Sequence, residues 1–228
     1  MEKISRLVFI GMLVCVFACS SDKIVQNTVM YTDVNGNFVV EEKDGKYFHL
    51  QTSIPANGNI VMLYPDSAKL MLGKSVAGML EGEVKWFHPN GMLSVTAYLQ
   101  NGVFQDTLYR WYDSGKMEEK TFFKKNLLHG KRSFWYESGM QKGEYFYSNG
   151  VLAGEFKEWY PNGQLKKFGL YNKGLLEGEL VEYHENGVIS AKLKFTEGKL
   201  NGIITTWDQS GNEIASYFYQ FGKGGNKI

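Results

Sequence analysis

The chain has 228 residues, with 25 basic and 24 acidic side chains, a formal net charge of +1 and 43% hydrophobic residues. A balanced charge with no basic run argues against a nucleic-acid-binding protein, which normally carries a basic excess on one face. Only 2 of the residues are cysteines, which argues against a disulfide-rich fold and a cysteine-based metal site.

Residues 1–18 predict a targeting segment. Two basic residues, Lys3 and Arg6, precede an apolar run, Leu7–Ala18, that is too short to span a bilayer comfortably. The run ends in Val16-Phe17-Ala18-Cys19, which resembles the lipobox of bacterial lipoproteins. This resemblance implies diacylation of Cys19 and cleavage before it, so Cys19 is the predicted lipidation site. An ordinary signal peptide with a coincidental cysteine is the alternative.

Residues 19–28 are predicted to be a lipid-anchored tether between the membrane and the fold. Cleavage removes Lys3, Arg6 and Glu2, leaving 25 − 2 = 23 basic and 24 − 1 = 23 acidic residues and no net charge. Ser20 follows the lipidated cysteine. In proteobacterial sorting an aspartate there favours inner-membrane retention, so Ser20 implies the outer membrane, on either its periplasmic or its surface side.

Residues 29–57 predict an N-terminal β cap. Turn signals at Asn35-Gly36 and Asp44-Gly45 separate apolar stretches that read as three short strands. These strands do not follow the spacing of the rest of the chain, and repeat arrays need such atypical ends to protect a terminal edge.

A tandem repeat of 24 residues organises the remainder of the chain. One series consists of glycines, and Asp106 is its one exception. Its glycines are Gly82, Gly130, Gly154, Gly178 and Gly202. A second series has no exception: Gly91, Gly115, Gly139, Gly163, Gly187 and Gly211. A third is aromatic: Phe87, Trp111, Trp135, Trp159, Tyr183 and Trp207.

The repeat from 154 to 178 predicts a β-hairpin. Two segments rich in aromatic and branched residues, Glu155–Tyr160 and Gln164–Tyr171, flank the turn Pro161-Asn162-Gly163. Asn172-Lys173-Gly174 predicts a second turn, because such turns need residues that tolerate a positive φ. Hairpins joined by turns this short must lie side by side, so the fold class is an all-β, elongated antiparallel meander.

The predicted array covers residues 58–222. Residues 58–81 are a degenerate first repeat, and further repeats begin at 82, 106, 130, 154, 178 and 202. The glycine-rich end, residues 223–228, is predicted to be flexible. Strand alternation is expected to place Trp159, Leu165 and Tyr171 on one face of the sheet, with Phe156, Tyr160 and Leu176 on the other.

These repeats resemble the bacterial variant of the MORN repeat. In the unit from 154 the pattern consists of Gly154, Trp159, Tyr160, Gly163, Leu165, Tyr171, Gly174, Leu176 and Gly178. The resemblance implies the hairpin-array fold. Bacterial proteins of this kind include antitoxins of the YwqK type, so the resemblance also raises the alternative of a protein that neutralises a toxin by binding it.

The sequence predicts no catalytic residues, no metal site and no cofactor. His88 and His184 occupy equivalent positions four repeats apart, about 38 Å at two strands per repeat, so one ion cannot bind both. The many carboxylates are not paired with a nucleophile or a metal motif, and the glycine-rich turns do not open a helix as phosphate-binding loops do.

An aromatic ladder is the predicted contact surface. The residues that form it are Trp111, Tyr112, Trp135, Tyr136, Trp159 and Tyr160. Exposed rings of this kind bind glycans or the apolar side chains of a partner. The alternative is that these rings pack against one another as the core of the repeat.

We therefore expect a non-enzymatic, lipid-anchored protein of the bacterial cell envelope, whose repeats form a protein-interaction scaffold. Its expected partners are the membrane, through lipidated Cys19, and another envelope protein, with no nucleic acid. Two alternatives stay open. One is an antitoxin or immunity protein, and the other is a glycan- or lipid-binding module that uses the aromatic ladder.

Overall fold

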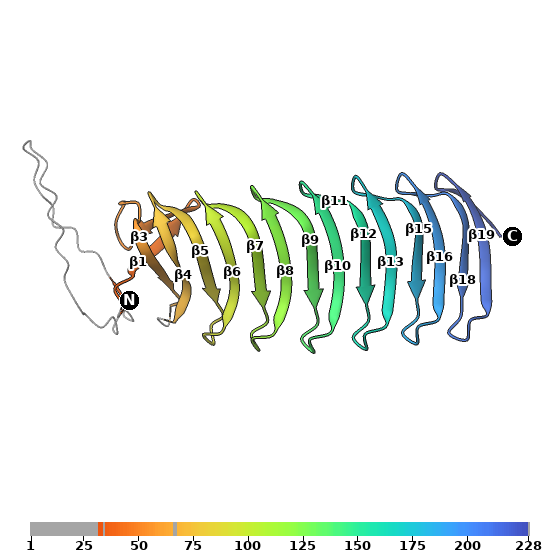
Figure 1. Cartoon of the computed structure of the whole chain (residues 1–228), viewed down its shortest axis with the longest axis horizontal. Coiled ribbons are helices and arrows are strands. Elements are labelled where there is room, and N and C mark those ends of the chain that lie inside the picture. The colour runs from red at the N-terminus through yellow and green to blue at the C-terminus, as the bar shows by residue number, and fades with distance from the viewer. Residues whose placement is uncertain (1–31, 34, 66–67, 228) are drawn as a thin grey trace, which may run out of the picture. The chain divides into compact units, whose positions relative to one another are not determined.

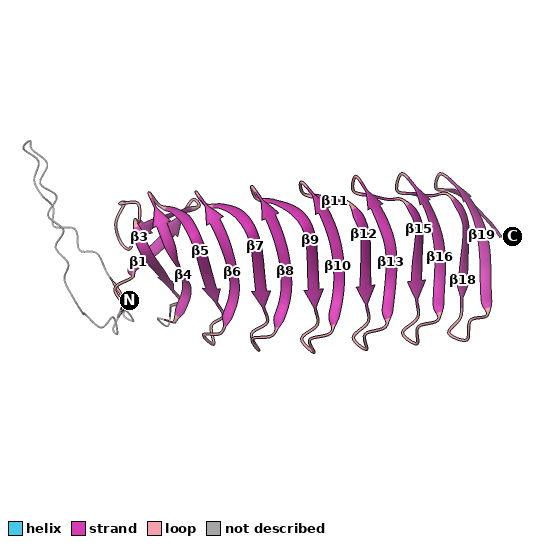
Figure 2. Ribbon diagram, viewed as in Figure 1, coloured by secondary structure: helices cyan, strands magenta, loops and turns pink. Residues whose placement is uncertain are grey.

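The computed structural model describes residues 32–33, 35–65 and 68–227. The predicted signal segment, Cys19 and the tether lie outside the described residues. The chain divides into two compact units, residues 1–104 and 105–228, and each is described by itself. In the described part every regular element is a β-strand (Figure 2), and none of its residues form a helix long and apolar enough to cross a membrane.

Unit 1 contains an antiparallel run of strands preceded by a two-stranded cap. Its strands are β1 (Phe38–Lys43), β2 (Lys46–His49), β3 (Gly58–Leu63), β4 (Lys69–Val76), β5 (Met79–Phe87) and β6 (Leu93–Gln100). The boundary between the units falls within β7 (Val103–Trp111), inside the array that the sequence analysis treats as one domain.

Unit 2 is an open antiparallel row of hairpins, seen from β8 to β19 in Figure 1. After β7 its strands are β8 (Met117–Lys124), β9 (Leu127–Trp135), β10 (Gln141–Ser148), β11 (Val151–Leu152), β12 (Gly154–Trp159), β13 (Leu165–Asn172), β14 (Leu175–Leu176), β15 (Gly178–Tyr183), β16 (Ile189–Thr196), β17 (Lys199–Leu200), β18 (Gly202–Trp207), β19 (Glu213–Gln220) and β20 (Lys223–Lys227). The predicted all-β hairpin array is confirmed.

The cap of unit 1 contains two of the three predicted strands, and residues 29–31, where the first one would begin, lie outside the described residues. Thr32 forms an isolated bridge with Phe38. Between them, Asp33 Oδ1 accepts hydrogen bonds from the backbone N–H groups of Asn35 and Asn37, which is typical of a turn. Strand β1 pairs in parallel with β3, where Ile60 is fully buried. The cap therefore covers the first repeat.

The two-residue turns follow the sequence prediction. In unit 2, Asn149 and Gly150 have φ values of 50° and 83°, and Lys173 and Gly174 have 49° and 82°. Two successive positive φ values define the type I′ turn, whose twist matches that of paired strands.

One face of the unit 2 sheet, called face A here, carries a buried apolar row. Its members lie at equivalent positions and are 3–8% exposed: Leu108, Phe156, Leu180 and Ile204. Gly169 lies directly opposite Phe156, and a Cβ at that glycine would come within 2.8 Å of the Phe156 ring. On face A the large side chain of Phe156 therefore packs over Gly169, which has no side chain. We call the opposite side of the sheet face B.

Each hairpin of unit 2 from β7 to β19 contains a register shift beside its aromatic residue. Glu158 pairs with Lys167 but Trp159 pairs with Leu165, which leaves Lys166 as an extra residue. The other hairpins shift at the same place. An extra residue of this kind is a β-bulge, and it changes the alternation of side chains beyond it.

The predicted assignment of Trp159, Leu165 and Tyr171 to one face, opposite Phe156, is therefore wrong. The rings of Phe156 and Tyr171 lie 4.8 Å apart, so both are on face A. The bulge at Lys166 is the physical reason, because side chains no longer alternate regularly between the faces across an extra residue.

The C-terminal end also differs from its prediction. Residues Lys223–Lys227 form β20, which pairs with β19, whereas the sequence analysis expects a flexible tail. The Phe221-Gly222 turn, with φ values of 46° and 79°, is the same type of turn that joins the other hairpins, and it returns the chain to the sheet edge.

A pair of substitutions tests the backbone requirement of the glycine series. Asp106 replaces glycine in that series and has φ 63°, while Gly130 has φ 75° and no atom within 4 Å of a Cβ placed there. We expect Asp106→Gly to raise the free energy of unfolding by up to about 1 kcal/mol and Gly130→Ala to lower it by about 1–2 kcal/mol. Urea unfolding of the purified chain measures both, and two effects of the same sign would contradict this account.

Candidate functional site

The predicted aromatic ladder lies at one end of the strands of unit 2. Each of its tryptophans ends a strand, namely β7, β9 or β12, and each tyrosine is the next residue. All six side chains are half-buried. The structure therefore brings the six predicted residues into one row, at equivalent positions in three successive repeats.

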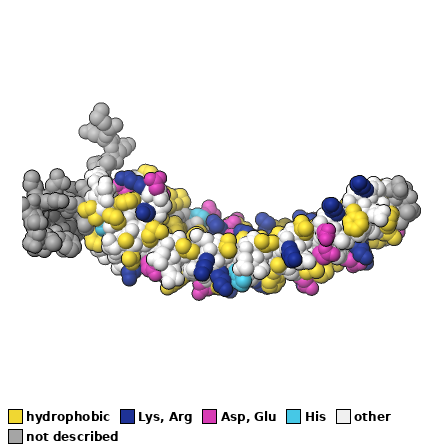
Figure 3. All heavy atoms as spheres, turned by 90° about the horizontal axis from the view of Figure 1, so that it is seen from above, with side chains coloured by type: hydrophobic (Ala, Val, Ile, Leu, Met, Phe, Trp, Pro, Cys, Tyr) yellow, Lys and Arg dark blue, Asp and Glu magenta, His cyan; other side chains and the backbone are white. Residues whose placement is uncertain are grey.

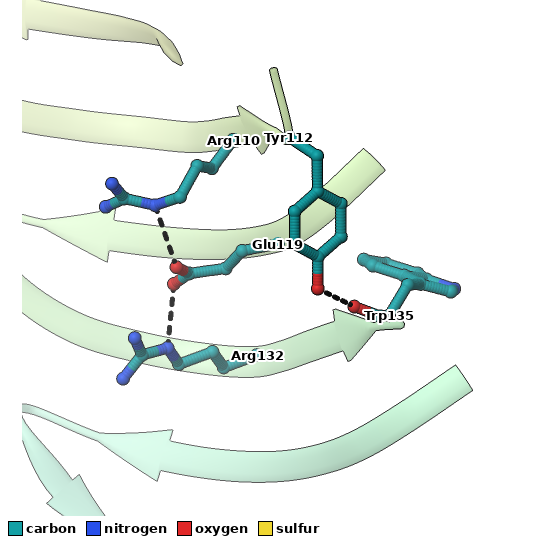
Figure 4. Close-up of polar contacts among 5 residues, drawn as sticks. All are labelled: Arg110, Tyr112, Glu119, Arg132 and Trp135. Carbon is teal, nitrogen blue, oxygen red and sulfur yellow. Dashed lines mark hydrogen bonds and ion pairs between the residues drawn. The ribbon is translucent and has the colours of Figure 1, made fainter. Parts of the chain in front are cut away.

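The tyrosines of this row link one repeat to the next. The hydroxyl of Tyr112 donates to the carbonyl oxygen of Trp135 at 2.7 Å (Figure 4). Tyr136 donates to the carbonyl of Trp159 at 2.8 Å, and Tyr160 makes the same bond one repeat further on. Burial, together with smaller effects of nearby carboxylates, raises the pKa of Tyr112 and Tyr136.

These hydrogen bonds give the tyrosines a structural role in addition to any role in binding. The ring of Trp111 stacks on Tyr109 with centroids 6.0 Å apart, which places this tryptophan over face B. Binding by the six residues stays a prediction.

The histidines occupy separate structural positions. His184 occupies the tyrosine position of its repeat, and its Nε2 lies 2.8 Å from the carbonyl oxygen of Trp207. His129 Nδ1 accepts a hydrogen bond from the backbone of Asn149. His49 is 4% exposed, and burial lowers its pKa. No cluster of three metal-binding side chains occurs among the described residues.

A row of charged side chains crosses face A, and the sequence analysis does not predict it. Residues from successive strands pair directly across the sheet: Arg110 with Glu119, Glu158 with Lys167, and Lys167 with Glu182. These positions also alternate in charge. Cross-strand pairs of opposite charge stabilise a sheet modestly, by about 0.2–1 kcal/mol each.

Glu119 is the buried centre of the first part of this row. Its side chain is 8% exposed, and its two carboxylate oxygens accept from Arg110 Nε at 3.3 Å and Arg132 Nε at 2.8 Å (Figure 4). The Arg132 guanidinium also lies over the ring of Phe134, 4.6 Å from its centroid. We call Arg110, Glu119 and Arg132 the arginine–glutamate triad.

The second part of the row contains two separate polar contacts, one at Glu158 and one between Lys167 and Glu182. The Tyr145 hydroxyl donates to Glu158 Oε1 at 2.6 Å, and burial together with this bond raises the pKa of Tyr145. Lys167 Nζ lies 3.0 Å from Glu182. Burial opposes the charge on Lys167, but the bond to Glu182 outweighs it, so the pKa of Lys167 is raised. The raised pKa values of Tyr145 and Lys167 favour the protonated form of both groups.

Face B carries an exposed apolar stripe that the sequence analysis also misses. It repeats over three units and consists of Phe122, Leu127, Phe146, Val151, Leu170 and Leu175, which are 37–49% exposed. The stripe lies beside the two-residue turns, because Leu127, Val151 and Leu175 each pack over the turn glycine of the following repeat. Hydrophobic and charged side chains alternate along the row of repeats in Figure 3.

Charged residues border this stripe. Phe146 pairs across the sheet with Lys131, and Leu170 pairs with Glu155. In the next repeat the positions equivalent to Leu170 and Leu175 are Lys194 and Lys199. An apolar patch with a polar rim is typical of a protein–protein interface.

Removing one tyrosine hydroxyl tests the link between repeats. We expect Tyr136→Phe to lower the free energy of unfolding by about 0.5–1.5 kcal/mol, because the carbonyl of Trp159 loses its partner. Tyr147→Phe is the matched control, since no hydrogen bond of the Tyr147 hydroxyl is found among the described residues. Urea unfolding measures both, and an equal cost for the two variants would contradict the proposed link.

Comparison with known protein families agrees with the observed hairpins. A family model described as the MORN repeat variant matches residues 80–101, 152–173 and 176–197. These segments cover strands β5 and β6 in unit 1 and β11 to β16 in unit 2. No curated protein matches the chain. The family suggests a binding or scaffold role, and the three matched hairpin segments of this chain are MORN-variant repeats.

Proposed function

We propose that the chain is a non-enzymatic, lipid-anchored scaffold of the bacterial cell envelope that binds another envelope protein through face B of unit 2. The apolar stripe carries this proposal. Its six side chains are 37–49% exposed on a single sheet. Exposed apolar side chains gathered on one face of a protein are typical of an interaction site.

Repetition supports a scaffold more than a single binding pocket. Phe122, Phe146 and Leu170 occupy equivalent positions, and two strands per repeat separate such positions by about 9.6 Å. A partner with regularly spaced apolar side chains would meet several equivalent contacts at once. Each contact is weak alone, and their sum gives the affinity.

The envelope location rests on the N-terminal sequence. The Val16-Phe17-Ala18-Cys19 segment resembles a lipobox, and Ser20 favours the outer membrane in a proteobacterial source. The anchor would hold one end of the chain at the membrane, and residues 20–28 would give the repeats reach.

Lysine substitutions in the stripe test the interface. We expect Phe146→Lys with Val151→Lys to reduce cross-linking to the partner in intact cells at least about tenfold, because two buried apolar contacts are lost. The fold should persist, since Lys194 and Lys199 occupy such positions naturally. Glu185→Lys, at an exposed turn, makes the same change in net charge and should leave cross-linking unchanged. Equal cross-linking by the double variant and the wild type would contradict the proposal.

Substitution of the lipidation site tests the anchor. We expect Cys19→Ala to abolish incorporation of labelled palmitate and to move the chain from the membrane fraction to the soluble fraction, because two acyl chains are needed for stable anchoring. Fractionation of the source cells measures this. Membrane association without label in the wild type would show that the cysteine is not acylated.

A further inference from the structure

We propose that Arg110 and Arg132 form a binding site on face A of unit 2 for a carboxylate of an acidic protein segment. This site goes beyond the proposed interface, since it lies on the opposite face from the apolar stripe. Four observations carry the proposal: the free edges of the two guanidinium groups, the local charge, the unusual residues in the row, and a buried hydroxyl without a partner.

Each guanidinium uses only one of its donor nitrogens inside the triad. Arg110 and Arg132 both donate to Glu119 through Nε, and no acceptor for their terminal nitrogens is found among the described residues. Figure 4 shows the terminal nitrogens of both arginines directed to the same side, away from the Glu119 carboxylate. Two planar groups of N–H donors are therefore presented together.

The triad presents positive charge to solvent. Its formal charges sum to +1 − 1 + 1 = +1. The carboxylate is hidden, with Glu119 8% exposed, while the Arg110 side chain is 44% exposed and that of Arg132 is 29% exposed. An approaching ligand therefore meets the guanidinium groups and not the carboxylate.

The stability of the sheet does not explain these residues. Arg132 occupies the row that holds Leu108, Phe156 and Leu180 in other repeats. The positions equivalent to Glu119 in the last two repeats are Ala191 and Ala215. A protein with apolar residues at such positions is often as stable as one with a buried ion network, or more stable. The triad therefore suggests a requirement other than stability.

A buried hydroxyl next to the triad lacks a hydrogen-bond partner. Thr121 is 2% exposed, and its Oγ1 has no hydrogen-bond partner among the described residues. It pairs with Arg132 across the sheet and shares face A with Glu119 on the same strand. This hydroxyl places a further polar group beside Arg132 on face A.

The chemistry of the site favours a carboxylate. The planar guanidinium binds carboxylates and phosphates through two parallel N–H bonds. A net charge of +1 matches the single negative charge of a carboxylate more closely than the charge of a phosphate. Phe134 and Tyr145, whose rings lie 6.2 Å apart on the same face, add apolar surface for the rest of an acidic peptide.

The test is a titration of the full purified chain with a labelled peptide of consecutive glutamates, followed by fluorescence anisotropy. We expect Arg110→Gln and Arg132→Gln to weaken binding at least about tenfold each. Glu119→Gln should strengthen binding, because the net charge of the triad rises from +1 to +2. Lys167→Gln, which removes another cation of face A, is the matched control and should change the affinity less than about twofold.

A second measurement tests the site even if an arginine variant fails to fold. Addition of the glutamate peptide to the wild-type chain should shift the Nε–Hε resonances of two arginines in nuclear magnetic resonance spectra, and Glu119→Gln should enlarge that response. Weaker or unchanged binding by Glu119→Gln would overturn the proposal. An equal loss in Lys167→Gln would also overturn it, since that result indicates non-specific charge attraction.

Two further probes distinguish the source of the anion. A phosphoserine peptide or a soluble short-chain phosphatidylglycerol that binds more tightly than the glutamate peptide would overturn the carboxylate assignment. Because the apolar stripe is intact in all these variants, failure here leaves the face B interface standing, and failure of the stripe experiment leaves this site standing.

Discussion

Hydrogen bonds between consecutive repeats are the constraint on which unit 2 depends. At one end of the strands, Tyr136 reaches the carbonyl of Trp159. At the other end, the backbone N–H of Gly174 donates to the carbonyl of Leu152. A single sheet has no second layer to hold its strands, so bonds of this kind and the strand pairing fix the spacing. Each type of bond joins residues at a constant separation along the chain. The 24-residue interval is therefore kept from one repeat to the next.

The two faces of the sheet use this framework differently. Face A buries Phe156 against Gly169 and Leu180, yet the same face holds the arginine–glutamate triad in the two preceding hairpins. Face B has charged residues and a stripe of exposed apolar ones. The repeated backbone therefore allows the side chains of one repeat to change without altering its neighbours, as expected when each unit contacts only the adjacent units. Positions that leave the repeat pattern are the most informative about function.

Much of the fold could be predicted from the sequence, because turns and strands are local. Asn149-Gly150 and Pro161-Asn162-Gly163 specify where the chain reverses, and the aromatic series marks the strands. The faces could not be assigned correctly, since the bulge at Lys166 depends on pairing with the neighbouring strand. The charged row on face A could not be predicted either, because it also depends on how neighbouring strands pair. Arg110 and Arg132 meet Glu119 only once the register of three strands is known.

The alignment of the six ladder residues could be predicted from the sequence, and their role in binding stays a prediction. The row from Trp111 to Tyr160 does come together, but the hydroxyl of Tyr112 is used by the backbone of Trp135. That bond joins residues 23 apart, and no local signal reveals it. The exposed stripe follows from which face Phe146 occupies, so it also required the register. Turns and strand segments are thus readable from the sequence, and contacts that depend on the register between strands are not.

The most direct test of the account is photo-cross-linking from face B in living source cells. A photoreactive phenylalanine analogue in place of Phe146 would be compared with the same analogue in place of Glu185, in a full-length lipidated chain. The account predicts one dominant protein adduct from position 146 and a much weaker adduct from position 185. No protein adduct from position 146, or the same adducts from both positions, would contradict an interface on the apolar stripe.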